Sequence, residues 1–132
     1  GNDEAVKLSA FQSEISASFN TAGTLNLDEE LALMSRLDIM IAMDSSNMHR
    51  AALSGTKVIS IWGGTDPITG FGAWKQPEDY SVRIQVDELT CRPCTIYGKG
   101  ECRRGDLACM NWLTPEIVFR KIEKIISPAY LK

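Results

Sequence analysis

Residues 43–55, MDSSNMHRAALSG, bring together side chains that could bind a phosphorylated sugar. Asp44 is followed by Ser45 and Ser46 and then by a segment of helical composition. His49, the only histidine of the chain, falls in the first turn of that expected helix. The amides at a helix start attract phosphate, because they lack partners within the helix and lie at the positive end of its dipole. The imidazole could donate to the same phosphate oxygens, and Asp44 could accept from sugar hydroxyls.

The same residues allow two other interpretations. Ser46 or Asn47 could be an ordinary helix cap, with His49 as a solvated residue of the first turn. A Ser-His-Asp hydrolase is disfavoured, because no G-x-S-x-G sequence surrounds either serine and residues so close in sequence rarely form that triad.

Two apolar segments flank this region and predict neighbouring parallel strands. Residues 38–43, DIMIAM, contain five apolar residues without alternation, which is typical of a strand buried on both faces. Residues 57–62, KVISIW, predict a second buried strand, and the helix expected at 47–54 would end at Gly55. A strand, a helix and a strand in this order form a parallel βαβ unit. The predicted fold class is therefore α/β with a Rossmann-like parallel sheet, in which ligands bind at the carboxyl ends of the strands.

Periodicity and capping residues predict the remaining elements. The first helix is expected to be amphipathic, with Leu8, Phe11 and Ile15 on one face. In a second helix, Asn26 and Glu29 are spaced as a capping box. We expect a last helix to stop at Ser127–Pro128. The predicted ranges are helices at 3–16, 26–37 and 114–126, an outer strand at 80–86, and a long glycine-rich loop at 63–79.

Composition narrows the class of protein. The chain has 132 residues and a net charge of −3, which argues against a nucleic-acid-binding surface. Arg36 and Asp38 interrupt the longest apolar run, so no transmembrane segment is expected. We expect residues 1–132 to form a single, partial domain, because the chain begins without a strand before its first helix.

Two linked blocks of sequence resemble a known family. Residues 38–67, from DIMIAMDSSNMHR to GGTDP, resemble the donor-binding domain of the heptosyltransferases, the family-9 glycosyltransferases of lipopolysaccharide core biosynthesis. The cysteine pattern CRPC…EC…CM followed by TPEIV is similar to the end of many members. The resemblance implies the C-terminal, donor-binding half of a two-domain glycosyltransferase of GT-B type. It departs from the family at Ser46, where a glycine is usual, and at Gly64, where a proline is usual.

The resemblance also implies roles for individual residues. Ser45, Ser46 and neighbouring amides would hold the pyrophosphate of an ADP-heptose-like donor with help from His49, and Asp44 would bind the transferred sugar. Leu25 matches a position that meets the adenine through its backbone, and Glu4 lies near a ribose-binding acid. The full set of expected donor-binding residues is Glu4, Leu25, Asp44, Ser45, Ser46, His49 and Thr65, the last at the exit of the second strand.

The same resemblance implies what this chain lacks. The general base and the site for a lipopolysaccharide-type acceptor belong to the N-terminal half of the family's enzymes, so we expect no catalytic residue here and no activity of this portion alone. Transfer would require no metal cofactor. The full-length enzyme would be cytoplasmic, or peripheral to the inner membrane.

Four cysteines fall within a cysteine-rich loop, residues 91–109. Four thiolates could hold a structural Zn²⁺, although the spacing is not that of a standard zinc ribbon. Disulfides are a second interpretation and free thiols, which suit a reducing compartment, are a third. An alternative function follows from the zinc interpretation, namely a non-catalytic, metal-stabilised interaction module built on this loop. The candidate metal ligands are Cys91, Cys94, Cys102 and Cys109.

Overall fold

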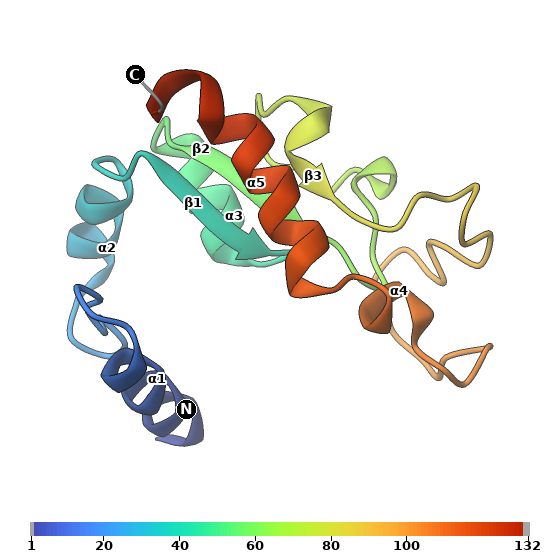
Figure 1. Cartoon of the computed structure of the whole chain (residues 1–132), viewed down its shortest axis with the longest axis horizontal. Helices are drawn as coiled ribbons and strands as arrows, with labels where there is room; N and C mark the ends of the chain where they lie inside the picture. The colour runs from blue at the N-terminus through green and yellow to red at the C-terminus, as the bar shows by residue number, and fades with distance from the viewer. Residues whose placement is uncertain (1, 131–132) are drawn as a thin grey trace. The chain divides into compact units, whose positions relative to one another are not determined.

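A computed structural model describes residues 2–130 of the chain and the side chains of residues 6–126. The chain divides into two compact units, Gly1–Leu33 and Met34–Lys132. Figure 1 shows the helices and strands in chain order. The parallel sheet and the expected phosphate-binding segment both belong to the second unit.

The first unit contains helix α1 (Asn2–Glu14) and most of helix α2 (Leu27–Met34). The predicted capping box is confirmed, since the backbone N–H of Asn26 donates to Oε2 of Glu29 at 2.8 Å and the N–H of Glu29 donates to Oδ1 of Asn26 at 3.0 Å. The predicted first helix is present as α1, but its apolar face is exposed. Phe11, the largest side chain of that face, is 62% exposed, because periodicity defines an apolar face but cannot supply a surface to cover it.

The second unit is built on a three-stranded parallel sheet in the order β1-β2-β3. Strands β1 (Ile39–Met43) and β2 (Lys57–Ile61) pair along their whole length, with Met43 opposite Ile61. This confirms the predicted α/β class and the positions of both strands to within a residue. Strand β3 (Ser81–Val82) is much shorter than the predicted 80–86, because its ladder ends where the Val82 carbonyl accepts the N–H of Trp62.

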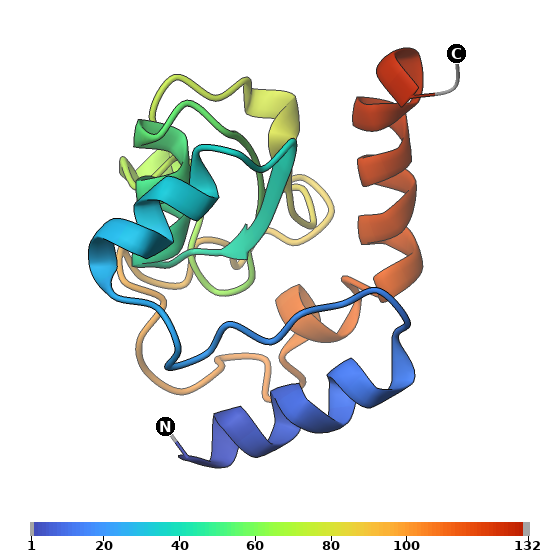
Figure 2. The same ribbon diagram turned by 90° about the vertical axis from the view of Figure 1, so that its left-hand side faces the viewer.

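Helix α3 (Ser46–Leu53) connects β1 to β2 and covers one face of the sheet (Figures 1 and 2). It ends as predicted, with Gly55 at φ +86°, a left-handed conformation that glycine adopts at little cost. The core lies between this helix and the strands. Its buried members are Met34, Ala42, Met48, Ala51, Ala52, Val58 and Trp62.

The opposite face of β1 is open, which corrects the prediction that this strand is buried on both faces. Ile41 and Met43 are 48% and 44% exposed. Helix α5 (Pro115–Tyr130) runs along this face in Figure 2, and an apolar groove of about 890 Å³ lies between Met43 and Ile61 on the strands and Phe119 on the helix. A continuous apolar run shows that both faces of a strand can be buried, but packing decides whether they are.

The loops carry short helical turns, η1 (Pro67–Thr69), η2 (Glu78–Tyr80) and α4 (Ala108–Asn111). The predicted stop of the last helix at Ser127–Pro128 is wrong, because α5 continues to Tyr130. A proline within a helix removes one backbone hydrogen bond and crowds the carbonyl four residues earlier, but α5 continues past this position. Across the described residues, no helix combines the length and apolar character needed to cross a membrane.

Met48 provides a test of the core. The Met48→Ala variant should lower the free energy of unfolding by about 2–5 kcal/mol, because the side chain is fully buried against the sheet. The matched control is Leu53→Ala on the same helix, where the side chain is 72% exposed and the expected change is about 0.5 kcal/mol or less. Urea denaturation of both variants would measure the difference, and equal losses would contradict this packing of α3.

Candidate functional site

The carboxyl ends of β1 and β2 open into a cavity of about 260 Å³. Asp44 follows β1 directly, and Thr65 lies in the β2 exit loop (residues 62–66). Because the two strands are parallel, their ends meet at one edge of the sheet, and Asp44 and Thr65 line the same cavity. The sequence predicted both residues as ligand contacts, and the structure brings them together.

The start of α3 lies next to this cavity. Ser45 is its N-cap residue, in extended conformation at φ −155° and ψ 166°, which corrects the alternative that placed the cap at Ser46 or Asn47. Within the described structure, the Ser45 hydroxyl makes no capping hydrogen bond and the first turn of α3 holds no acidic residue. The first amides of α3 are therefore open to an anion.

The remaining predicted residues fall into two groups. Ser45 and Ser46 are exposed at the start of α3, and His49 is half-buried in its first turn. Leu25 lies in the first unit, half-buried in the turn before α2. Glu4 lies in α1, and its side chain is outside the described residues. The predicted roles of Leu25 and Glu4 stay predictions.

Residues of the cysteine-rich loop complete the cavity, and the sequence analysis missed them. Tyr97 and Gly98 line the cavity together with Asp44 and Thr65, and Met110 of α4 contributes from just after the loop. The Tyr97 ring also contacts Phe71 of the glycine-rich loop, with 5.9 Å between ring centroids. The pair Tyr97–Gly98 in a loop could have marked these residues as candidates for the site. The sequence does not indicate, however, which strand end that loop reaches.

Gly98 is required by close packing at the cavity wall. Its φ is +62°, and a Cβ atom added there would lie 2.8 Å from Cγ2 of Thr65 and 3.2 Å from the carbonyl carbon of Gly64. Gly63 is less constrained, because an added Cβ would lie 2.0 Å from the sulfur of Met110, a flexible side chain that can move away. The β2 exit loop and the cysteine-rich loop therefore meet backbone to backbone.

The four cysteines are free thiols, with Cys109 buried at the start of α4 and the other three half-buried. Burial raises the pKa of Cys109, and the charges of the three other thiolates raise it further. Backbone N–H groups, first that of Leu107, lower the pKa of Cys102. Among the described residues, no group of three or more His, Cys, Asp or Glu side chains is placed to hold a metal ion. The predicted Zn²⁺ site gains no support from this arrangement and stays a prediction.

Gly98→Ala tests the contact between the two loops. Gly100 is the matched control, because its φ is +107° but an added Cβ there has nothing within 4 Å. Both alanine variants should lower the free energy of unfolding by about 1–2 kcal/mol, the cost of placing a side chain on a left-handed residue. Gly98→Ala should lower it further, because it also displaces Thr65. Urea denaturation would compare the two, and the Thr65 amide shift should change only in Gly98→Ala. Equal losses of unfolding free energy in the two variants, with an unchanged Thr65 amide shift, would contradict the close contact between Gly98 and the β2 exit loop.

The cysteines should differ in reactivity with pH. As the pH is raised from 6, Cys102 should be alkylated by iodoacetamide before Cys109, because a lowered pKa gives more thiolate at a given pH. Peptide mass mapping after short exposures would measure both rates. Urea-unfolded protein is the control, where the two rates should converge, and faster alkylation of Cys109 in the folded protein would contradict the assignment.

Comparison with known families identifies the chain. The model of "Glycosyltransferase family 9 (heptosyltransferase)" matches residues 2–99, which include Asp44, His49, Thr65 and Tyr97. Comparison with curated proteins and with solved structures gave no match. The matched residues cover the whole parallel sheet and the cavity wall except Met110. The chain therefore belongs to glycosyltransferase family 9, the heptosyltransferase family.

Proposed function

We propose that the cavity at the ends of β1 and β2, with the start of α3, binds the nucleotide-sugar donor of a glycosyltransferase. The observation that carries this proposal is the meeting of Asp44 and Thr65 in one cavity beside the open amides of α3. A pyrophosphate needs N–H donors, and a sugar needs carboxylate and hydroxyl partners. Both kinds of partner lie at this edge of the sheet, where parallel α/β folds bind ligands.

The charges divide the site into two parts. The diphosphate would occupy the start of α3, because the amides and the helix dipole stabilise negative charge there. His49, half-buried in the first turn, would donate to the same oxygens. Asp44 would repel phosphate and would instead accept from the hydroxyls of the transferred sugar. The donor is then an ADP-heptose-like compound, as the family description "heptosyltransferase" suggests.

The remaining parts of the reaction are proposed to lie outside this site. Membership of family 9 supports a two-domain enzyme of GT-B type whose other half holds the general base and a lipopolysaccharide-type acceptor. The role of the present chain is to hold the donor. The Ser46 side chain, at a position where the family usually has glycine, narrows the approach of the diphosphate to the first amides of α3.

Comparing the binding of ADP with that of an ADP-sugar tests the diphosphate and sugar parts of the proposed site independently. The wild-type chain should bind both ADP and an ADP-sugar such as ADP-glucose, with amide shifts at Ser45, Ser46 and His49. His49→Ala should lower the affinity for both ligands, since it removes a hydrogen-bond donor to the phosphates. Asp44→Ala should lower the affinity for the ADP-sugar alone, by about tenfold or more, because one hydrogen bond to a charged group is lost. Chemical-shift titration would give both dissociation constants.

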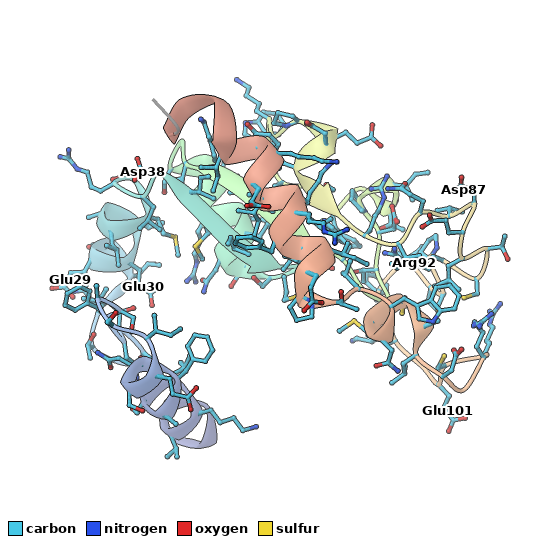
Figure 3. All side chains as sticks on the ribbon, in the orientation of Figure 1. Glu29, Glu30, Asp38, Asp87, Arg92 and Glu101 are labelled. Carbon is cyan, nitrogen blue, oxygen red and sulfur yellow. The ribbon has the colours of Figure 1, made fainter. Side chains whose placement is uncertain are left out.

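Asp38→Ala is the control, because Asp38 is an exposed aspartate that precedes the opposite end of β1 (Figure 3). It should leave both affinities unchanged, and UDP should bind more weakly than ADP. Absence of binding by both ADP and the ADP-sugar would refute a donor site on this chain. Equal effects of Asp44→Ala on the two ligands would refute its assignment to the sugar.

A further inference from the structure

A buried ion cluster lies directly behind the cavity wall. The side chains of Arg92 and Asp66 are 0% and 1% exposed, and Nη2 of Arg92 lies 3.6 Å from Oδ2 of Asp66. Arg83 approaches from the other side, with its Nη1 3.4 Å from Oδ1 of Asp66. Figure 3 labels Arg92 among the loops that follow β3. Charged side chains are almost never fully buried unless they are paired, so this arrangement needs a reason.

The Arg92 guanidinium donates to backbone carbonyls from separate segments. Its Nη2 donates to the carbonyl of Thr65 at 2.8 Å and to that of Trp62 at 3.2 Å, and its Nη1 donates to the carbonyl of Ile84. Trp62 and Thr65 bracket the two glycines of the β2 exit loop, Gly63 and Gly64, which line the cavity. Fixing the carbonyls at both ends therefore fixes the backbone between them.

The Asp66 carboxylate offsets part of the cost of burying this guanidinium. Burial lowers the pKa of Arg92, and the Asp66 carboxylate opposes that shift. Oδ1 of Asp66 also accepts the N–H of Ile68, so the carboxylate is itself held at the start of η1. The pairing is incomplete, because Nε of Arg92 and Oδ2 of Asp66 make no hydrogen bond among the described residues. The strongest contacts of Arg92 are thus those to the loop carbonyls.

Arg92 also connects this loop to the second wall of the cavity. It opens the cysteine-rich loop, whose Gly98 packs within a few ångströms of Gly64 and Thr65. The same loop supplies Tyr97. One side chain therefore joins the two loops that face Asp44 across the cavity.

We infer that Arg92 is a positioning residue of the donor site, which sets the β2 exit loop and the cysteine-rich loop at the distance that the donor requires. This inference rests on the proposed donor-binding function. A lysine could replace the charge opposite Asp66, but its single ammonium cannot reproduce the planar fork that reaches the carbonyls of Trp62, Thr65 and Ile84. Arginine is therefore required at position 92 for geometry and not for charge alone.

Arg92→Lys is the test, made in the whole 132-residue chain. The affinity for ADP-glucose should fall by about tenfold or more, because the loop that carries Thr65 loses its anchoring hydrogen bonds. The amide shifts of Gly63, Gly64 and Thr65 should move in the ligand-free protein. Affinity is measured by titration at a temperature where every variant is folded, so that loss of stability alone does not contribute.

Two controls separate positioning from stability. Val58→Ala removes a fully buried side chain near the start of β2, away from the cavity, and should lower the melting temperature without changing the affinity. Arg103→Lys makes the same substitution at an exposed position of the cysteine-rich loop and should change neither property. Asp66→Asn, which keeps the acceptor for Ile68, is a second variant should Arg92→Lys not fold, and it too should weaken ADP-glucose binding.

The outcomes are distinct. Weaker binding in Arg92→Lys, with unchanged binding in Val58→Ala, supports the positioning role. A lower melting temperature with unchanged affinity in both Arg92→Lys and Asp66→Asn would overturn it and leave the donor site intact. A wild-type chain that binds neither ADP nor ADP-glucose would overturn the proposed function, and with it any role of Arg92 in that site.

Discussion

Parallel pairing of β1 with β2 is the constraint on which the rest of the second unit depends. Parallel neighbours cannot be joined by a tight turn, so the chain must cross over between them, and α3 makes that crossing. The crossing has two consequences. It covers one face of the sheet and forms the core around Met48, and it brings the carboxyl ends of both strands to one edge. The Asp44 and Thr65 positions, the start of α3 and the cavity all follow from that pairing.

The edge of the sheet supplies only part of the cavity. The other part comes from loops, which have no ladder of hydrogen bonds to fix them. In the β2 exit loop, hydrogen bonds from the buried Arg92 guanidinium hold the backbone instead. Arg92 donates to the carbonyls of Trp62 and Thr65, on either side of the two glycines that follow β2. Close backbone packing at Gly98 then holds the cysteine-rich loop against the same segment. Strand pairing therefore fixes one wall of the site, and the Arg92 hydrogen bonds together with the packing at Gly98 fix the other.

Much of the local structure was predictable because it depends on neighbours in sequence. The capping box at Asn26 and Glu29, the left-handed Gly55 and the strands flanking α3 all depend on residues within a few positions of one another. Two of the errors concern partners distant in sequence. An unbroken apolar run predicted two buried faces for β1, but Ile41 is exposed, because burial depends on what packs against a strand. The apolar face of α1, which carries Phe11, is exposed for the same reason. The last helix passes Pro128, where a local rule predicted its end.

The sequence by itself determined the α/β class, the strand ends and the chemistry gathered there, since Asp44, the two serines and His49 are contiguous with β1 and α3. It also determined the family, through the block at residues 38–67, which lies within the residues 2–99 that the family model matches. Only the tertiary structure decided that Tyr97, Gly98 and Met110 close the cavity, and that Arg92 and Asp66 are buried behind it. The physical reason is separation along the chain: hydrogen bonds from Arg92 to Trp62 and Thr65 span 30 and 27 residues, and no local pattern specifies such a contact.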